Sequence, residues 1–579
     1  MHSRTTVQAV ALGTEPADLV VRGDQVLSPT RRTLLDRDVA VVDGVIAGLF
    51  EDAEDVVGPE TTVVDANNGV VAPGLIDPHT HLDLHQTFET SYHRALAGGT
   101  TAIVSEVAAF GPSFGAAGVE ALLAATADLP VKVFATVPPQ PVFDMFEPAW
   151  AGDADRDALL DLLDRGRVVG VGETAWIRVV GRETPATTLY DAAHERGKVV
   201  TGHGAGCRGS RLRAFAIDAD DDHEAIAGEG VLERVEAGIH AVGRYGSIRD
   251  DMAAIGDASP DLDAGELSIS TDGMWPTDLV GEGYMDAVLR RAVDVGVDPV
   301  DAVGMATRTP ARHWGLDGLG TLKPGTPADL VVFGDLERFG VETTIADGAV
   351  VYDGGDPDSP AEPRYDYPAS FTNLVDLGLS AADLSVPAAD AVEGAVLAIE
   401  YGGGLLTSPT TATPAVEGDS LVADAPDLVK VALFDRHPDR EGGGFVGFLS
   451  GFDLDRGAVA TSVTWETTGV LAVGADDDDM LAAVATLEGM GGGWAVVDDG
   501  DVVATHATPV GATCSRRPVE ETAERYAAIE SAIGSLGVTA ERPMLGLQTM
   551  SFVGTPALKM GFDGYLDIRA GAVVGRSPE

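Results

Sequence analysis

Two histidines separated by one residue, His79 and His81, end the stretch PGLIDPHTH, which continues an apolar run. If this run forms a strand, its two-residue period turns both imidazoles to the same side. Neutral imidazoles are common ligands of divalent transition metals. The pattern His-x-His therefore indicates half of a metal site, although two ordinary polar residues at the end of a strand would have the same spacing.

Four later segments end in further candidate ligands. Glu173 ends VVGVGE, His203 ends KVVTGH, His223 ends DADDDH and Asp272 ends ELSISTD. Taken singly, Glu173 or Asp272 could cap a following helix, and His223 could be one more surface residue of an acidic run. Glu173, His203 and Asp272 end predicted strands, and His223 precedes a predicted helix. Their order favours a shared site, because in a barrel of parallel strands these ends meet at one face.

Six nitrogen and oxygen ligands suit two divalent ions that are bridged by a carboxylate and a hydroxide. The set lacks thiolates and so allows manganese, iron(II) or zinc; we predict manganese or iron(II), with zinc as the third option. Such ions lower the pKa of bound water towards about 7. Asp272 would orient the resulting hydroxide and carry its proton to the leaving group. The predicted reaction is hydrolysis at an sp² carbon of an amide, a lactam or an amino-heteroaromatic ring.

Residues 72–318 alternate strand-like apolar runs with helical patterns. TTAIVSEV, VKVFATV and KVVTGHG are examples of the runs, and GVEALLAATADL is one of the helical segments between them. This alternation indicates βαβ units and a parallel sheet. A length of about 250 residues favours a TIM-type (β/α)8 barrel. A doubly wound open sheet is the second choice, because no Gly-x-Gly-x-x-Gly follows the first strand.

Two β-rich segments of similar pattern flank the predicted barrel. Residues 1–71 contain short apolar runs punctuated by Asp-Gly and Asn-Gly pairs, which are typical of tight turns, and residues 319–365 repeat the pattern. We expect one split β-sandwich, built from both segments, into which the barrel is inserted. The segment GGDPDSPAEPRYDYPAS indicates a linker. Residues 366–579 are predicted to form a C-terminal α+β domain.

The chain is strongly acidic. It has 92 Asp and Glu against 38 Lys and Arg, a formal net charge of −54, and runs such as DADDDHE at 218–224 and ADDDDM at 475–480 illustrate this composition. A protein with so much self-repulsion is expected in high salt, where the Debye length falls to about 3 Å at molar concentration. The same charge argues against nucleic acid as a partner, since phosphate binding needs a basic surface.

The remaining composition limits the compartment and the partners. Two cysteines exclude a disulfide framework. The N-terminus lacks the apolar core of a secretory signal, and no apolar run reaches the roughly 18 residues that a membrane helix needs. We therefore expect a cytoplasmic protein that binds no membrane. Its predicted partners are a small heterocyclic substrate and a second copy of the chain in a homodimer.

Taken together, these motifs resemble the adenine deaminase family of the amidohydrolase superfamily, over nearly the whole chain. PGLIDPHTH resembles the first metal strand of the family, and GETAW, GHGAG, DDHEA and STDG resemble its later ligand motifs; LGTLKPGTPADLVVFGDL and CSRRPVEETAERYAAIESAIGSLGV extend the similarity to the end of the barrel and to the C-terminal domain. The resemblance implies that Glu173 bridges two metals and acts with Asp272 in catalysis. It also implies hydrolysis of adenine to hypoxanthine and ammonia in purine salvage.

Departures from the family pattern cluster around the expected substrate pocket. Gly273 stands where the family has a second aspartate, and Thr464–Thr467 replace a His-Asp-Ser-His-like stretch. Residues 105–108 (SEVA) replace Asp-Pro-His-Glu, and LDLH follows His81 in place of Ile-Glu-Ser-Ser. The candidates for substrate contact are Asp83, His85 and Trp275.

These departures leave three hypotheses open. The first is adenine deamination. The second is hydrolysis of another cyclic amide or amino-heterocycle on the same dinuclear site, since the ligands are retained while the pocket differs. The third is a barrel that binds a purine-like ligand without turnover. The retained Asp272 argues against the third, because a pure binding protein does not need a proton shuttle.

Overall fold

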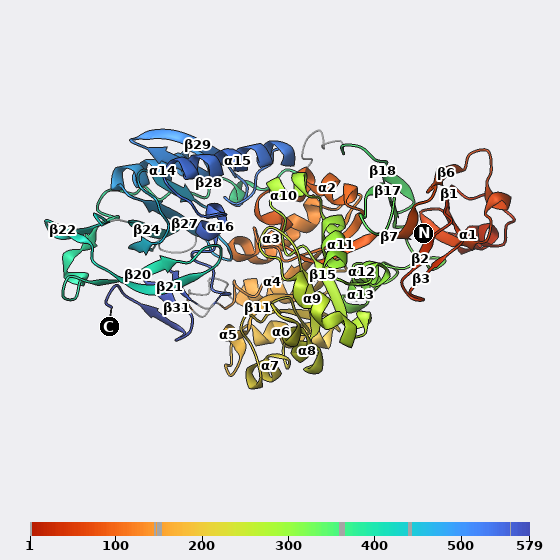
Figure 1. Ribbon diagram of the computed structural model, residues 1–579, viewed down its shortest axis with the longest axis horizontal. Coiled ribbons are helices and arrows are strands. Elements are labelled where there is room, and N and C mark those ends of the chain that lie inside the picture. The colour runs from red at the N-terminus through yellow and green to blue at the C-terminus, as the bar shows by residue number, and fades with distance from the viewer. Residues whose placement is uncertain are drawn as a thin grey trace.

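The chain folds into three regions that lie in a row (Figure 1). The computed structural model describes residues 3–143, 146, 153–357, 365–425, 427–437, 443–555 and 557–578. The barrel occupies the centre, a β-rich region that includes the N-terminus lies on one side of it, and the C-terminal region lies on the other. No helix in these ranges is both long and apolar enough to span a bilayer.

The central region is a sheet of eight parallel strands, ordered along the chain from β8 to β15. Its strands are buried at nearly every position, as expected for parallel strands that helices cover on the outside. This arrangement confirms the predicted TIM-type barrel. The strands are β8 (Leu75–Thr80), β9 (Thr100–Ser105), β10 (Lys132–Val137), β11 (Val168–Ala175), β12 (Val199–His203), β13 (Asp221–Asp222), β14 (His240–Arg244) and β15 (Leu267–Ser270).

Helices between the strands form the outer layer of the barrel (Figure 1). Apolar side chains on their inner faces pack with the strands in one large core cluster, for example Leu122 of α3, Leu189 of α6 and Val288 of α11. The main helices are α2 (Tyr92–Ala97), α3 (Gly111–Ala125), α4 (Asp153–Leu162), α6 (Thr187–Glu195), α8 (Gly228–Glu236), α9 (Met252–Ala258) and α11 (Met285–Asp294).

The first and last strands of the barrel meet at their C-terminal ends. Thr80 and Asp272 form an isolated parallel bridge. On either side of it, the His81 N–H donates to the Asp272 carbonyl at 2.9 Å, and the Asp272 N–H donates to the His79 carbonyl at 3.2 Å. The closure therefore fixes the His-x-His motif beside Asp272, although these residues are far apart in the sequence.

The β-rich region combines strands from both sides of the barrel, which confirms the split sandwich; the exact domain boundaries stay predictions. Strand β16 (Leu330–Phe333) pairs antiparallel with β7 (Val70–Pro73), so both flanking segments contribute to one sheet. That sheet has the order β18-β17-β16-β7-β2-β3, and the second has the order β5-β4-β1-β6. The other strands are β1 (Leu19–Arg22), β2 (Val26–Ser28), β3 (Thr33–Leu35), β4 (Asp38–Val42), β5 (Val45–Phe50), β6 (Thr62–Asp65), β17 (Val341–Ala346) and β18 (Ala349–Tyr352).

The C-terminal region is built on an eight-stranded mixed sheet with the order β21-β20-β25-β24-β27-β26-β28-β29. The predicted linker lies partly outside the described residues. The strands are β20 (Val396–Tyr401), β21 (Thr407–Ala412), β24 (Leu428–Asp435), β25 (Gly444–Ser450), β26 (Ala458–Thr461), β27 (Gly469–Gly474), β28 (Gly493–Asp498) and β29 (Asp501–Ala507); the helices are α14 (Asp477–Met490), α15 (Val519–Ser535) and α16 (Pro543–Gln548).

Each of the two acidic runs that illustrate the composition contains a side chain with a specific structural role. In the run 218–224, Asp222 is buried and accepts from Arg234 Nε at 2.6 Å. Strand β13 lies within this run, and the sequence did not predict a strand there because two acidic residues carry no apolar signal. In the run 475–480, the Asp476 side chain accepts from two backbone N–H groups and caps helix α14.

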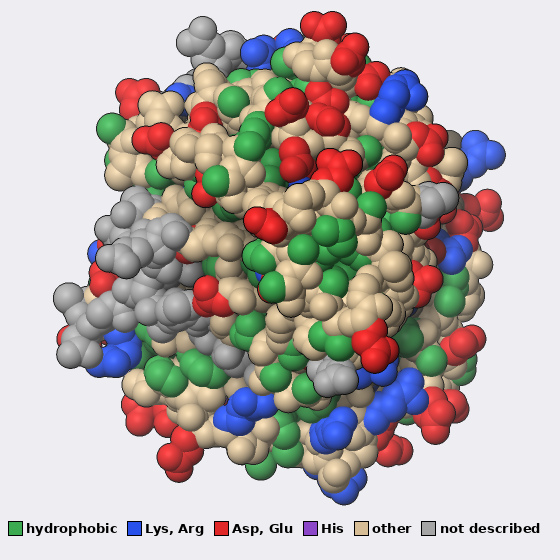
Figure 2. Space-filling view, turned by 90° about the vertical axis from the view of Figure 1, so that its left-hand side faces the viewer, with side chains coloured by type: hydrophobic (Ala, Val, Ile, Leu, Met, Phe, Trp, Pro, Cys, Tyr) green, Lys and Arg blue, Asp and Glu red, His purple; other side chains and the backbone are tan. Residues whose placement is uncertain are grey.

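Most of the acidic excess must therefore be carried elsewhere. Figure 2 shows Asp and Glu side chains spread over the face of the C-terminal region, interspersed with Lys and Arg. With a formal net charge of −54, repulsion between these exposed groups opposes the compact state unless salt screens it.

We expect the midpoint of thermal unfolding to rise as KCl increases from about 0.1 M to about 1 M, because the Debye length falls from about 10 Å to about 3 Å over this range. Differential scanning calorimetry measures the change. Sucrose at matched osmolality is the control, since it carries no charge. An unfolding midpoint that does not respond to KCl, or responds equally to sucrose, would contradict the screening argument.

Candidate metal centre

All six predicted ligands lie together at the C-terminal rim of the barrel. Each lies among the last three residues of a strand or within two residues after its end: β8, β11, β12, β13 and β15 all contribute. None of the six is more than 8% exposed. They are His79, His81, Glu173, His203, His223 and Asp272.

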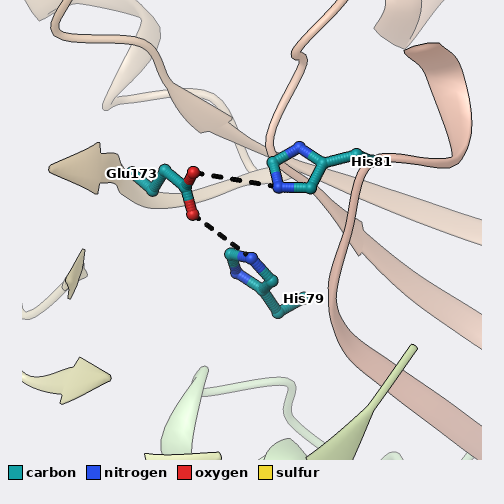
Figure 3. A group of neighbouring side chains, drawn as sticks. All are labelled: His79, His81 and Glu173. Atoms are coloured by element: carbon teal, nitrogen blue, oxygen red, sulfur yellow. Dashed lines mark ion pairs between the residues drawn. The ribbon is translucent and has the colours of Figure 1, made fainter. Parts of the chain in front are cut away.

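The Glu173 carboxylate lies at the centre of this group. Figure 3 shows its two oxygens turned towards the His-x-His imidazoles, with Oε2 3.4 Å from His79 Nε2 and Oε1 3.8 Å from His81 Nε2. On its other side, Oε2 lies 3.5 Å from His223 Nε2 and 3.9 Å from His203 Nδ1. A single carboxylate therefore faces all four imidazoles.

Asp272 approaches the same imidazoles from the last strand. Its Oδ1 lies 3.6 Å from His79 Nε2 and 3.5 Å from His81 Nε2. Its backbone has a φ of 60°, in the left-handed region that non-glycine residues seldom adopt. Such backbone conformations recur at functional sites, where the surrounding structure holds them. The β8–β15 hydrogen bonds provide that support here.

The chemistry of this set fits divalent metal ions. His79 Nε2 and Glu173 Oε2 are buried and have no hydrogen-bond partner within the described structure, which is rare for buried polar atoms. The residues form three overlapping groups, and within each group the possible ligand atoms lie within 4.8 Å of one another. The groups are His79, His81 and Glu173; His79, His223 and Asp272; and Glu173, His203 and His223. Two of these groups share Glu173, as expected for a carboxylate placed between two ions.

A buried glutamate that the sequence showed only as a departure from the family pattern stands behind the first ligand. Glu106 follows β9, and its Oε1 lies 3.2 Å from His79 Nδ1. Thr136 Oγ1 donates to its other oxygen at 2.9 Å. A carboxylate on the second nitrogen of a ligating imidazole fixes the orientation of the ring. The sequence contained a signal that could have identified Glu106, because this residue stands at the end of a predicted strand, as most of the candidate ligands do.

An arginine at the end of β14 connects three carboxylates at the rim. Arg244 Nη1 donates to Asp272 Oδ2 at 2.9 Å and lies 2.5 Å from Glu224 Oε1, while its Nε donates to Asp251 Oδ2 at 2.8 Å. All four residues are buried. A search limited to His, Asp and Glu could not find Arg244, although its place at a strand end was visible in the sequence.

These contacts determine the charge state of Asp272. Burial by itself raises the pKa of its carboxyl, but Arg244 and the facing imidazoles outweigh burial and hold this pKa well below the usual value. The residue is therefore a carboxylate with one oxygen fixed by the arginine and the other turned towards the imidazoles.

The three candidates for substrate contact differ in their surroundings. Asp83 is occupied, because its oxygens accept from Ser105 Oγ at 3.2 Å and from the Ala109 N–H at 3.0 Å. His85 Nδ1 lies 2.9 Å from Tyr526 OH, and burial lowers the pKa of its ring to about 3. Trp275 lies edge-on to His85, with ring centroids 5.3 Å apart. Their roles in binding stay predictions.

The glycine that replaces the expected second aspartate lies in a closely packed place. A Cβ at Gly273 would lie 3.0 Å from Ile248 Cδ1 and 3.6 Å from His81 Cβ. Only the first of these distances is shorter than ordinary van der Waals contact, and a small shift of the flexible end of Ile248 would relieve it. Nothing in the structure explains the absence of a second carboxylate.

Comparison with known protein families matches two parts of the chain. Residues 70–351 match the amidohydrolase family, and residues 404–572 match the adenine deaminase C-terminal domain. Adenine deaminase from Moorella thermoacetica is 32% identical over 96% of this chain and 95% of its own length. Adenine deaminase from Nitratidesulfovibrio vulgaris strain DP4 is also 32% identical, over 97% of this chain and 96% of its own length.

Solved structures similar to this chain cover somewhat more than half of it. A β-aspartyl dipeptidase from Fervidobacterium islandicum has a TM-score of 0.47 at 19% identity, and covers 59% of this chain and 98% of its own. An N-acetyl-D-glucosamine-6-phosphate deacetylase from Mycobacterium smegmatis has a TM-score of 0.45 at 20% identity, and covers 58% of this chain and 100% of its own.

We expect His223→Ala to lower the amount of divalent metal that co-purifies with the protein, from about two ions per chain to one or fewer, because a ligand of the shared group is lost. His240→Ala is the matched control: His240 lies at the opposite end of the barrel, where its Nε2 is 2.8 Å from Ser268 Oγ. Elemental analysis of both variants makes the measurement. Equal metal content in the two variants would refute the ligand assignment.

Arg244→Met should lower the free energy of unfolding by about 3–5 kcal/mol, since it leaves buried carboxylates without their cation. Arg249→Met is the control, because Arg249 also contacts Asp251, at 2.9 Å, but its side chain is 38% exposed. Because Arg249 is solvent-accessible and Asp251 keeps its bond to Arg244 in this variant, we expect about 1 kcal/mol or less. Urea denaturation of both variants gives the two values, and equal losses would contradict the distinction.

Proposed function

The chain belongs to the adenine deaminase family, and on that premise we propose that it hydrolyses adenine to hypoxanthine and ammonia. The observation that carries the proposal is the convergence of four imidazoles and Asp272 on the Glu173 carboxylate. This convergence occurs in a chain whose relatives, at 32% identity over nearly their full length, are named adenine deaminase.

The residues of the site have distinct tasks in this reaction. Divalent ions held by the six ligands would supply Lewis-acid activation of water at neutral pH. Glu173 faces both pairs of imidazoles and would hold the two ions at a fixed separation. Glu106 would keep the His79 ring in its orientation through Nδ1. These residues prepare the nucleophile but do not move the proton.

Asp272 is the residue placed to move a proton. Its Oδ1 faces His79 and His81, and is therefore on the side where water would be activated. Its Oδ2 stays bonded to Arg244, so the carboxylate can accept a proton on one oxygen while the other holds it in place. It would then donate this proton to the exocyclic amine, which leaves as ammonia.

We further propose manganese or iron(II) as the ions, with zinc as the third option, since a ligand set of only nitrogen and oxygen is compatible with all three. The acidic composition supports a protein that works in high salt, and the reaction would serve purine salvage inside the cell. Metal analysis of protein purified without added metal distinguishes manganese and iron from zinc.

A second candidate substrate, another cyclic amide or amino-heterocycle, is supported by one specific observation. The Trp465 ring stands 5.8 Å from the His81 ring, in the segment Thr464–Thr467 that departs from the family pattern. An indole in place of a polar stretch changes what the pocket can recognise while the ligands stay the same. The reaction type would then be retained and the ring would differ.

Ammonia release from adenine by metal-reconstituted protein in molar KCl tests the proposal. We expect Asp272→Asn to lower kcat by about 10²–10⁴, because the proton shuttle is lost. Asp278→Asn is the control, since Asp278 pairs with Arg542 at 2.9 Å, outside the ligand set. Undiminished release by Asp272→Asn would refute its role. Release from other heterocycles but not from adenine would establish the second candidate.

A further inference from the structure

Two aromatic rings of the C-terminal region lie against the ligands of the barrel. Trp465, between β26 and β27, has its ring centroid 5.8 Å from that of His81, with the planes tilted by 32°. Phe552, after α16, lies 5.4 Å from His203 at 78°. The Trp465 and Phe552 rings are themselves 5.4 Å apart. Together they form a continuous aromatic wall from one end of the ligand set to the other.

The backbone of the same region reaches the ligands as well. The Gly554 carbonyl lies 3.1 Å from His203 Nε2. A Cβ on Gly554 would come within 2.5 Å of that nitrogen, so the close approach requires glycine. The backbone N–H of Trp465 donates to the backbone carbonyl of Gln548 at 3.2 Å. This bond joins the segment that carries Trp465 to the segment that carries Phe552 and Gly554.

The barrel fixes this wall in place through the residue after the tryptophan. Glu466 accepts from Arg178 Nη2 at 3.1 Å and from Gln140 Nε2 at 2.8 Å. Arg178 lies in the short helix α5 (Trp176–Val179) that follows the strand of Glu173. The φ of Glu466 is 54°, in the left-handed region. The wall is therefore held at the rim by contacts from two loops of the barrel.

Several buried polar groups in the segments that carry the wall lack partners. Trp465 Nε1, both amide atoms of Gln548 and Ser551 Oγ are buried without a hydrogen-bond partner in the described ranges. Buried indole N–H groups usually have an acceptor. His81, the ligand beside Trp465, is also the most exposed of the six, at 8%. Unpartnered donors beside the most open ligand are what a site for a polar planar molecule requires.

We propose that Trp465 and Phe552 form the surface that contacts the planar heterocycle of the substrate, Phe552 through its ring face and Trp465 through the ring edge, where Nε1–H donates to a ring nitrogen or carbonyl oxygen. The inference rests on the proposed function for the class of substrate. Aromatic side chains bind flat nitrogen heterocycles through their π faces and edges. Because the wall belongs to the C-terminal region, that region selects the substrate, while the barrel supplies the ligands and the proton shuttle.

Binding of the product hypoxanthine to the metal-loaded protein, followed by calorimetry and by quenching of tryptophan fluorescence, tests the wall without turnover. We expect Trp465→Ala and Phe552→Ala to weaken binding by about tenfold or more, as for the loss of one stacking contact. Trp465→Phe should fall between wild type and Trp465→Ala, because it keeps a ring and loses the N–H. Metal content should stay at the wild-type level in all three variants.

Trp494→Phe is the matched control, since Trp494 is fully buried in the same region but belongs to the interior strand β28. It should bind like wild type and keep the quenching that Trp465→Phe loses. Wild-type affinity in both Trp465→Ala and Phe552→Ala would overturn the proposal, and so would weakened binding that accompanies loss of metal.

The outcomes separate the wall from the proposed activity. Suppose that wild type releases ammonia from adenine and that Trp465→Ala leaves its KM unchanged. The proposed substrate contact of the aromatic wall is then refuted, while the proposed activity is supported. If adenine is not a substrate, the same binding series is run with the heterocycle that is turned over. Weaker binding of that heterocycle by Trp465→Ala then supports the substrate contact of the aromatic wall, although the proposed substrate is wrong. Unchanged binding refutes this contact.

Discussion

Closure of the barrel between its first and last strands is the constraint on which the site depends. The Thr80–Asp272 bridge and the two backbone hydrogen bonds beside it bring the His-x-His motif and Asp272 together. Asp77, within the same motif, adds a side-chain link, because Thr271 Oγ1 donates to its carboxylate at 2.6 Å. Burial raises the pKa of Asp77 to about 6 although these hydrogen bonds oppose the shift. The ligand geometry is thus a consequence of how the sheet closes.

Carboxylates serve two opposite purposes in this chain. On the surface they are numerous and weakly coupled, and their mutual repulsion makes the compact state dependent on screening by salt. Inside the barrel four of them are paired with an arginine: Asp222 is bonded to Arg234, and Glu224, Asp251 and Asp272 surround Arg244. A buried carboxylate without such a partner is costly, so these pairs are retained as units. Loss of a single surface carboxylate is therefore expected to change stability little, whereas loss of a paired carboxylate at the rim leaves its arginine buried without a partner.

The candidate site is shared between two regions, to which we assign different tasks. The barrel provides the candidate ligands on strand ends, where the backbone is held on both sides. The C-terminal region contributes Trp465, Phe552 and the Gly554 carbonyl from loops that the barrel clamps through Glu466. Reaction type and substrate choice can thus change separately: the six ligands stay fixed while the loops above them vary.

The sequence by itself determined the barrel, the split sandwich and which candidate ligands come together. In a (β/α)8 barrel, polar residues that follow buried strands must meet at one rim, so residue type and order were sufficient to place His79, Glu173 and Asp272 side by side. The pattern failed at β13, because two buried acidic residues look the same as exposed ones until their partners are known.

Only the tertiary structure decided how the ligands are supported and what covers them. Contacts such as Arg244 with Asp272, Glu106 with His79 and Trp465 with His81 join residues from different strands or from different regions. Their distances depend on register, on closure and on how the C-terminal region docks. None of these is encoded in local spacing, because side chains that meet across a fold carry no periodic signal along the chain.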